Sequence, residues 1–356
     1  MSQKPVTIED AKDTSKIDKK KILPHYRDGK STVKVVPKKG KALDLCATWG
    51  EEYVCCNVHV LKSVQNCPYD CSYCFLQNYL NDGTMKVVGD IKALIDEVKE
   101  KTAKQPWRFF RIGTWELGDS LALEKQTGQA RQLIQEFSKL PNALLELKTK
   151  SDQVDSILDI DHKGRTVVSW SVNPQTLIKR DEKGTASIKE RLNAMQKVVA
   201  SGYLVGLHFD PMILHDGWEE NYWQLVRDIF EVVPLHQIAW ISIGSLRFNP
   251  EMKKTMEINF PASDLTHQEM VLGSDGKIRY VKPIRVEMYE HLYRALTIFG
   301  DNDLLIYFCM ERWDVWQKVL GYTPRSSGHL DFLFTQSLHD RFPGLVHLKP
   351  NLKLYE

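Results

Sequence analysis

The sequence predicts an α/β protein built as a partial (βα)6 barrel of the TIM type, followed by a C-terminal extension that contains a β-hairpin. Two observations carry this prediction. Apolar, strand-like runs alternate with helical periodicity up to about residue 245, and polar or cysteine-containing motifs recur where the strands end. The alternation alone also fits an open, doubly wound sheet. Because functional groups of a barrel gather at the carboxyl ends of its strands, the recurrence of motifs there favours the barrel.

Six strand–helix units with short connections account for the first two thirds of the chain. The expected strands are residues 58–64, 108–112, 143–147, 165–172, 203–209 and 237–243. The expected helices are residues 88–101, 125–140, 154–160, 188–201 and 219–232. After residue 250 the pattern changes. Residues 272–286 predict a hairpin around a Ser-Asp-Gly turn, and a helix at 287–297, a strand at 304–309 and a helix through Val319 follow.

Three regions are expected: a basic leader of residues 1–42, the barrel at 43–245 and, where the strand–helix pattern breaks, the extension at 246–356. The leader holds 12 Lys and Arg against 5 Asp and Glu, a local balance of +7, whereas the whole chain carries +2. A basic arm on a mildly acidic body can attract a polyanion such as nucleic acid. The alternative is a solvated and partly disordered leader with no ligand.

The composition excludes several classes of protein. No apolar run approaches the roughly 20 residues of a membrane span, so no membrane partner is expected. The first residues lack the apolar segment of a secretory signal, and a cytoplasmic location is expected. Seven cysteines, an odd count, argue against a disulfide framework in that compartment.

The run Cys67-Pro-Tyr-Asp-Cys71-Ser-Tyr-Cys74-Phe is the main chemical motif. Three thiolates at spacings of four and three residues can bind three corners of a cubane [4Fe–4S] cluster. With no fourth cysteine nearby, one iron stays open to a substrate. Structural zinc is the alternative, but it would need a fourth ligand such as His59 and more often uses C-x2-C pairs.

This C-x3-C-x2-C pattern, with an aromatic residue before the last cysteine, resembles the radical S-adenosylmethionine superfamily. The resemblance implies that S-adenosylmethionine chelates the open iron and is cleaved to a 5′-deoxyadenosyl radical. It also implies a Gly-Gly-Glu-like turn after the second strand, which Gly113 and Glu116 match, for the methionine ammonium.

Four more residues are candidates for cofactor contacts. Tyr73 either packs over the cluster or contacts the nucleoside, and Lys150 either neutralises the methionine carboxylate or is a solvated lysine. Ser171 and Asn173 suit ribose hydroxyls, with helix capping as the alternative.

Longer motifs narrow the resemblance to the spore photoproduct lyase family. Cys71-Ser-Tyr-Cys74-Phe-Leu-Gln77 is similar to its cluster loop, and Pro211-Met-Ile-Leu-His215-Asp-Gly-Trp218-Glu-Glu-Asn-Tyr222 resembles its Pro…His-x-Gly-Trp-Glu-Glu-x-Tyr segment. The strand-end runs 147–150 and 171–173 are similar to the family's as well.

The resemblance implies repair of UV-damaged DNA: the adenosyl radical abstracts a hydrogen atom from a thymine photolesion and the cross-link fragments. An electron donor such as flavodoxin or ferredoxin is implied as a partner. The pair Arg279 and Tyr280 resembles the pair that meets the damaged DNA, with Lys282 and Arg285 as further phosphate contacts and Tyr280 stacking beside an extruded base. The alternative is a basic hairpin without a ligand.

Two positions depart from the family. Gly113 stands where the family has a cysteine that donates the closing hydrogen atom, and Phe75 stands where it commonly has a tyrosine of a radical relay. Either another group, such as Cys46, Cys55, Cys56 or Cys309, supplies the hydrogen atom, or the substrate differs. The alternatives are therefore a radical enzyme acting on an RNA base, a nucleoside or a peptide, and a non-catalytic iron–sulfur protein that binds nucleic acid.

Overall fold

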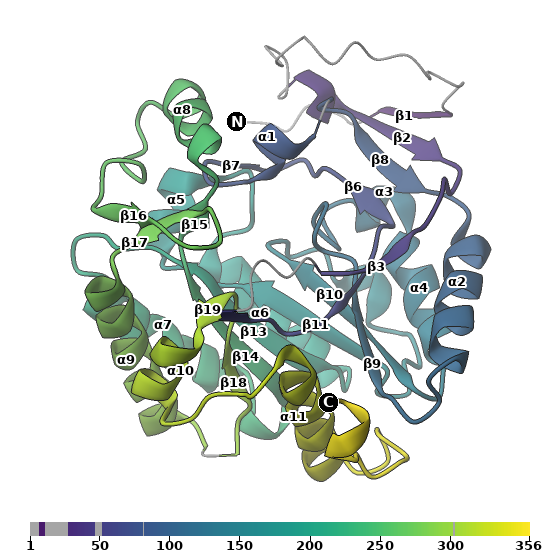
Figure 1. The fold of residues 1–356 in the computed structure, drawn as a ribbon. Coiled ribbons are helices and arrows are strands. Elements are labelled where there is room, and N and C mark those ends of the chain that lie inside the picture. Colours follow the sequence, from purple (N-terminus) through teal and green to yellow (C-terminus); the bar gives the residue numbers. More distant parts are fainter. Residues whose placement is uncertain (1–6, 11–27, 47–51, 81, 302) are drawn as a thin grey trace.

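The computed structural model describes residues 7–10, 28–46, 52–80, 82–301 and 303–356. Its centre is a curled sheet of eight strands, ringed by helices (Figure 1). In spatial order the strands are β18 (Ile306–Phe308), β14 (Ile238–Ser245), β13 (Leu204–Met212), β11 (Thr166–Ser171), β10 (Ala143–Thr149), β9 (Phe110–Gly113), β5 (His59–Leu61) and β3 (Leu43–Leu45). Neighbouring strands from β18 to β5 are parallel, and β3 is antiparallel to β5.

The sheet matches the predicted partial barrel, with one addition. All six predicted strands are present, and the strand predicted at 304–309 joins the same sheet as β18 instead of standing apart in the extension. The central strands are buried along most of their length, and every residue of β11 and β14 is buried. Burial on both faces is what a parallel sheet wrapped in helices requires, and it explains why these segments are nearly continuous apolar runs.

Helices cover the outside of the sheet. The longer ones are α2 (Ile91–Ala103), α4 (Gln129–Phe137), α6 (Ile188–Ala200), α7 (Trp218–Val232), α8 (Pro250–Asn259), α9 (Lys282–Phe299), α10 (Trp313–Leu320) and α11 (Ser327–Arg341). The shorter ones are α1 (Leu76–Tyr79), α3 (Glu124–Thr127) and α5 (Gln175–Asp181). The helix predicted at 125–140 is divided into α3 and α4 by Gly128, whose φ of 58° is a left-handed conformation that suits glycine.

Two predicted elements are corrected. The helix expected at 154–160 is a single 3₁₀ turn, η2 (Asp155–Ile157), because the chain soon turns back through Lys163 and Gly164, both with positive φ. The hairpin expected at 272–286 is shorter: β16 (Met270–Leu272) pairs with β17 (Ile278–Tyr280), and α9 already starts at Lys282. Pro283 lies in the first turn of that helix, where its missing N–H costs nothing.

Two small sheets hold most of the remaining strands. β1 (Thr7–Asp10), β2 (Thr32–Val36), β8 (Met85–Val88) and β6 (Val64–Gln65) form one of them. Part of the predicted leader is therefore folded, while residues 1–6 and 11–27 lie outside the described residues. In the other, β15 (Arg247–Phe248) pairs with β17, so the hairpin stands at the carboxyl end of β14.

A short strand pair connects the edge strand β18 with the segment before β5, which lies next to the opposite edge of the curled sheet. β4 (Tyr53–Val54), which lies just before β5 in the chain, pairs antiparallel with β19 (Glu311–Arg312), which lies just after β18 (Figure 1). The pair places the segment after β4 beside the carboxyl end of β18.

Candidate active site

The cysteine loop is attached to the carboxyl ends of the barrel strands. β7 (Asp70–Cys71) pairs antiparallel with β12 (Glu182–Lys183), with Cys71 opposite Glu182. β12 lies in the connection that leaves β11, so this pairing ties the middle cysteine to the rim of the barrel over a separation of more than 100 residues.

Side chains that the sequence did not single out hold this loop in place. Ser72 donates through its backbone N–H to the carbonyl of Asp181 (2.8 Å) and through Oγ to Asp181 Oδ1 (2.7 Å). Gln77 Nε2 donates to the carbonyls of Ser72 (2.9 Å) and Cys74 (3.2 Å). A loop whose backbone is bound in this way is pre-organised for its ligand.

The three cysteines of the loop differ in exposure. Cys71 is buried, and Cys67 and Cys74 are partly exposed. A cubane distributes its cysteines over separate irons, so three thiolates of one loop can bind three corners of a [4Fe–4S] cluster.

Burial favours the protonated thiol at two of the three cysteines. It raises the pKa of Cys67 to about 12 and raises that of Cys71 as well, although Lys30 and Lys150 respectively oppose the shift. Because iron binds thiolates, cluster assembly must release these protons.

Tyr73 and Asn173 meet at one buried carboxylate. The Tyr73 hydroxyl donates to Glu182, Asn173 Nδ2 donates to Glu182 Oε1 (2.9 Å), and Arg191 forms an ion pair with Glu182 Oε2 (2.6 Å). Although burial opposes the charge, Arg191 lowers the pKa of Glu182 to about 2. Asn173 also accepts a hydrogen bond from the Tyr222 hydroxyl (3.0 Å) and is buried, so its amide is already occupied within the protein.

Lys150 lies over the cysteine loop. Its Nζ is 5.5 Å from the centroid of the Tyr73 ring. Burial opposes its charge, but Glu182 and Cys71 outweigh that effect and raise the pKa of Lys150. The lysine is thus a cation held near Cys71 and Glu182, and its contact with a methionine carboxylate stays a prediction.

Ser171 contributes its backbone to the same region. It is buried at the end of β11, and its carbonyl accepts from Arg191 Nη1 (2.8 Å), the same arginine that pairs with Glu182.

Gly113 is the last residue of β9, and Glu116 lies in the connection that follows it. An ideal Cβ on Gly113 would lie 2.3 Å from Trp115 Nε1, so the indole occupies the space that a side chain at 113 would need. Glu116 is partly buried, and burial raises its pKa. The indole N–H donates to Glu146 Oε2 (3.1 Å).

Glu146 is the centre of a polar layer inside the barrel. This fully buried carboxylate forms an ion pair with Arg111 (2.8 Å) and accepts hydrogen bonds from His208 and Ser169 (2.8 and 2.9 Å). The sequence contained a signal for it, since Glu146 is the one charged residue within the apolar run 143–147. A fully buried charge with so many donors fixes the groups around it.

A second, partly buried ion pair lies toward the strand ends. Arg247 Nη1 is 3.0 Å from Asp210 Oδ1, and its Nη2 is 3.3 Å from Cys309 Sγ. Gly244 leaves room for it, because a Cβ there would lie 2.7 Å from Asp210 Oδ1.

The predicted exposed DNA contacts need correction. Arg285 is buried and bound to Glu311 through two hydrogen bonds (2.9 and 3.2 Å), and it lies in α9, not in the hairpin. Tyr280 is fully buried, and its hydroxyl accepts from the Leu214 N–H (3.2 Å).

The other two predicted contacts differ from each other. Arg279 is buried, stacks over Tyr53 at 4.8 Å and pairs with Asp275. Of the four, Lys282 alone is exposed, at 48% of its side chain, and it pairs with Asp314. Arg279 and Arg285 are buried because they contact Tyr53 and Glu311 of the β4–β19 pair, whereas Lys282 does not. A local sequence pattern cannot reveal these contacts.

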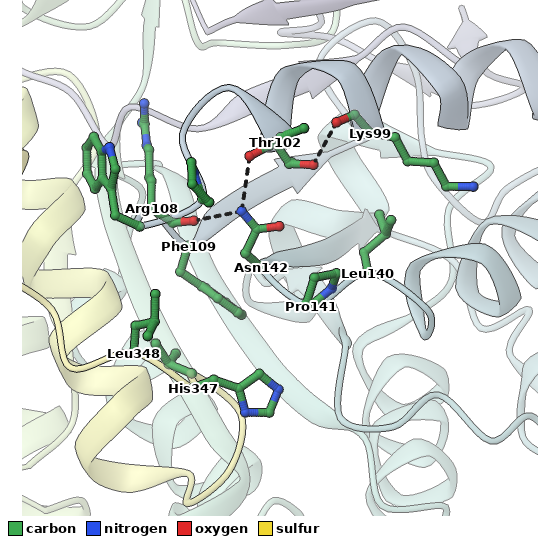
Figure 2. Close-up of a pocket in the computed structure, with 13 residues that line it drawn as sticks. Lys99, Thr102, Arg108, Phe109, Leu140, Pro141, Asn142, His347 and Leu348 are labelled. Carbon is green, nitrogen blue, oxygen red and sulfur yellow. Dashed lines mark hydrogen bonds between the residues drawn. The ribbon is translucent and has the colours of Figure 1, made fainter.

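Two surface hollows flank the barrel. One of about 380 Å³ lies at the amino-terminal ends of β9 and β10 and is lined by Phe109, Leu140 and Leu348, with Asn142 Nδ2 donating to the carbonyls of Thr102 and Arg108 (Figure 2). None of the predicted site residues lines it. The other, of about 610 Å³, is lined by residues 214–218 of the family-like segment together with Arg180 and Asp264.

Comparison with known proteins agrees with this site. The model of the family described as "Spore photoproduct lyase" matches residues 7–308. Spore photoproduct lyase of Bacillus subtilis (strain 168) is 26% identical over 299 residues, which cover 81% of this chain and 85% of the relative. The enzyme of that name from Geobacillus sp. (strain Y412MC61) is 28% identical over 254 residues, which cover 69% of this chain and 71% of the relative.

Solved structures share the fold. A double mutant of spore photoproduct lyase with bound AdoMet and dinucleoside spore photoproduct superposes with a TM-score of 0.73 at 23% identity, covering 83% of this chain and 88% of that one. Spore photoproduct lyase complexed with dinucleoside spore photoproduct superposes with a TM-score of 0.71 and covers the same shares of the two chains. The predicted partial barrel and the predicted family are confirmed, and with them the class of radical S-adenosylmethionine lyase with a [4Fe–4S] cluster. Since the family model spans most of the chain, this protein belongs to the spore photoproduct lyase family.

Proposed function

We propose that this protein repairs a thymine photolesion in DNA by radical S-adenosylmethionine chemistry. The observation that carries the proposal is the loop of Cys67, Cys71 and Cys74, fastened by β12 to the carboxyl end of β11 in a chain of the spore photoproduct lyase family. Relatives of that name and a structure with bound AdoMet and dinucleoside spore photoproduct support the substrate and the cofactor.

Cys67, Cys71 and Cys74 would hold the [4Fe–4S] cluster. When bound, the cluster supplies the electron that splits S-adenosylmethionine and yields the 5′-deoxyadenosyl radical. The chain's own residues position the cofactor and exclude water. Asp181 and Gln77 keep the loop in one conformation, and both are buried.

Lys150 and Glu116 carry charges suited to the two ends of a methionine. The ammonium of Lys150 pairs with the carboxylate, and the carboxylate of Glu116 accepts from the amino group. Tyr73 presents a ring that Glu182 holds in place, and the adenine or ribose packs against it. Ser171, on the same rim, contacts the ribose, while Asn173 orients Tyr73 through Glu182.

The segment from the hairpin to the start of α9 contacts the DNA through only one of the four predicted side chains, together with an apolar edge that was not predicted. Lys282 neutralises a phosphate, and the exposed side chains of Val271 (45%) and Leu272 (64%) form an apolar edge on β16. Apolar wedges of this kind separate stacked bases and help to extrude a nucleotide. Arg279 and Tyr280 support the hairpin from inside.

Reduction of the cluster requires a partner that delivers one electron at low potential, of the flavodoxin or ferredoxin type.

Within the described residues no helix is long and apolar enough to cross a membrane.

One observation favours a second candidate, a radical enzyme acting on another nucleobase, a nucleoside or a peptide. Trp115 fills the space beside Gly113, so the end of β9 is shaped differently from a site that holds a cysteine there.

Product analysis distinguishes the two candidates. The reconstituted, reduced protein is incubated with UV-irradiated thymine-rich DNA and S-adenosylmethionine, and the products are identified by mass spectrometry. Loss of the lesion together with 5′-deoxyadenosine formation supports repair. If 5′-deoxyadenosine forms but the lesion persists, the second candidate replaces the first, and if none forms with any reductant, both fail.

A further inference from the structure

Cys309 directly follows β18, and its side chain faces the interior of the barrel. Tyr307, two residues earlier, reaches inward, where its hydroxyl accepts from Arg111 Nη2 (3.1 Å). Phe308 between them points outward and packs on Trp316 and Tyr289 of the covering helices, at centroid distances of 5.3 and 4.8 Å. Because side chains alternate along a strand, Cys309 lies on the same face as Tyr307, one layer closer to the rim.

Polar groups hold the thiol in that layer. Its sulfur is 3.3 Å from Arg247 Nη2. Arg247 is held in turn by an ion pair with Asp210 of strand β13. The backbone N–H of Cys309 donates to the Ile243 carbonyl (2.8 Å). Position and orientation are therefore set by two separate elements.

Other thiols lie nearby but are less accessible. The β4–β19 pair sets Val54 opposite Glu311, which places Cys55 and Cys56 next to the end of β18. Both are buried, whereas Cys309 is partly exposed. Cys309 is thus the thiol of this group that a molecule entering the barrel would meet.

We propose that Cys309 donates the hydrogen atom that closes the reaction, an inference that rests on the proposed function. Removal of a hydrogen atom from the lesion and fragmentation of its cross-link leave a carbon radical on a thymine. Neither Gly113, which has no side chain, nor the Trp115 indole, whose N–H is bound to Glu146, offers a weak S–H bond at the end of β9.

The step balances as a hydrogen-atom transfer. The S–H bond of Cys309 breaks, a C–H bond forms on the thymine, and a thiyl radical remains. One electron from the low-potential donor that reduces the cluster, with one proton from solvent, restores the thiol. Burial raises the pKa of Cys309 well above its usual range, against the effect of Arg247, so the group keeps its hydrogen at neutral pH.

The test follows the transferred atom. Thiol hydrogens exchange with solvent, so the wild type in D₂O, acting on irradiated thymine-rich DNA, is expected to return thymine that carries one deuterium. Cys309→Ala should lower the deuterated product at least tenfold. Cys309→Ser, which keeps a polar group beside Arg247 but has a strong O–H bond, should behave the same way. Cys46→Ala, which removes another partly exposed thiol, is the matched control and should retain the label.

A measurement without turnover checks the placement. In cluster-free protein, irradiated oligonucleotide should slow alkylation of Cys309 by iodoacetamide at least threefold, and undamaged oligonucleotide should not. Unslowed alkylation, or an undiminished label in both Cys309 variants, overturns the proposal while repair by the wild type stands. If the wild type leaves the lesion intact, the proposed function fails and the role of Cys309 falls with it.

Discussion

The Trp115 indole lies against the Cα of Gly113, in the space where any larger residue would place its Cβ. The same indole donates to Glu146, and Lys148 Nζ lies 4.8 Å from the centre of its ring. A side chain at residue 113 and this tryptophan conformation therefore exclude one another.

Gly113→Ala should lower the free energy of unfolding by about 1–3 kcal/mol, because the added methyl group overpacks a rigid, hydrogen-bonded ring. In a Trp115→Ala background the same change should cost close to nothing. Urea unfolding of the four proteins of this cycle measures the coupling. Equal costs in both backgrounds would show that the ring does not restrict residue 113.

Stability should decrease as the pH falls from about 6.5 to about 4. Burial lowers the pKa of His208 from 6.5 to about 4, so in this window the unfolded chain binds a proton that the folded protein rejects. The contribution is fully present above pH 6.5 and is lost on acidification. His59, whose pKa burial lowers to about 3, acts in the same direction.

His208→Gln should flatten this dependence by up to about 1.4 kcal/mol per pH unit, the value for one proton. Urea unfolding at several pH values measures the slope. The exposed His267→Gln serves as control and should leave the slope unchanged. An unaltered slope in the His208 variant would mean that the folded protein protonates this imidazole as readily as the unfolded chain.

Asp181→Asn should weaken the cluster loop. The buried carboxylate accepts from Ser72 Oγ and Ser263 Oγ, each at 2.7 Å, and the amide loses the charge that strengthens both bonds. We expect reconstituted protein to retain roughly half of the wild-type iron, a loss at the low end of the effects of supporting residues. Iron and sulfide analysis measures this. Asp159→Asn, at an exposed ion pair, should retain all of it.

Arg285 and Lys282 should separate folding from DNA contact. Arg285→Ala leaves Glu311 buried without its partner and should cost about 3–5 kcal/mol in urea unfolding. Lys282→Ala breaks an exposed ion pair, should cost less than about 1 kcal/mol, and should weaken binding to irradiated oligonucleotide with a smaller salt dependence. Fluorescence anisotropy at two salt concentrations measures the binding. A stable Arg285 variant with weakened DNA binding would restore the exposed-contact interpretation.

Much of the fold could be predicted because its signals are local. The apolar runs of the six strands and the periodicity of most helices are present in the structure, whereas the short 154–160 segment and the end of the hairpin were wrong and the 125–140 helix is divided at Gly128. Both errors lie where a turn competes with a weak pattern: at Lys163 and Gly164, and at Pro283. Only the tertiary structure showed that β18 belongs to the main sheet, because the sequence of a strand does not specify which strands it pairs with.

By itself the sequence predicted the cluster ligands, because the spacing of Cys67, Cys71 and Cys74 is set by the covalent chain. It also identified Gly113 and Phe75 as departures. Only the tertiary structure decided what surrounds them: Asp181 and Glu182 beside the loop, Trp115 over Gly113, and Cys309 against Arg247. The reason is physical. Contacts between remote residues depend on how the sheet curls and on the register of its strands, which one segment alone does not specify.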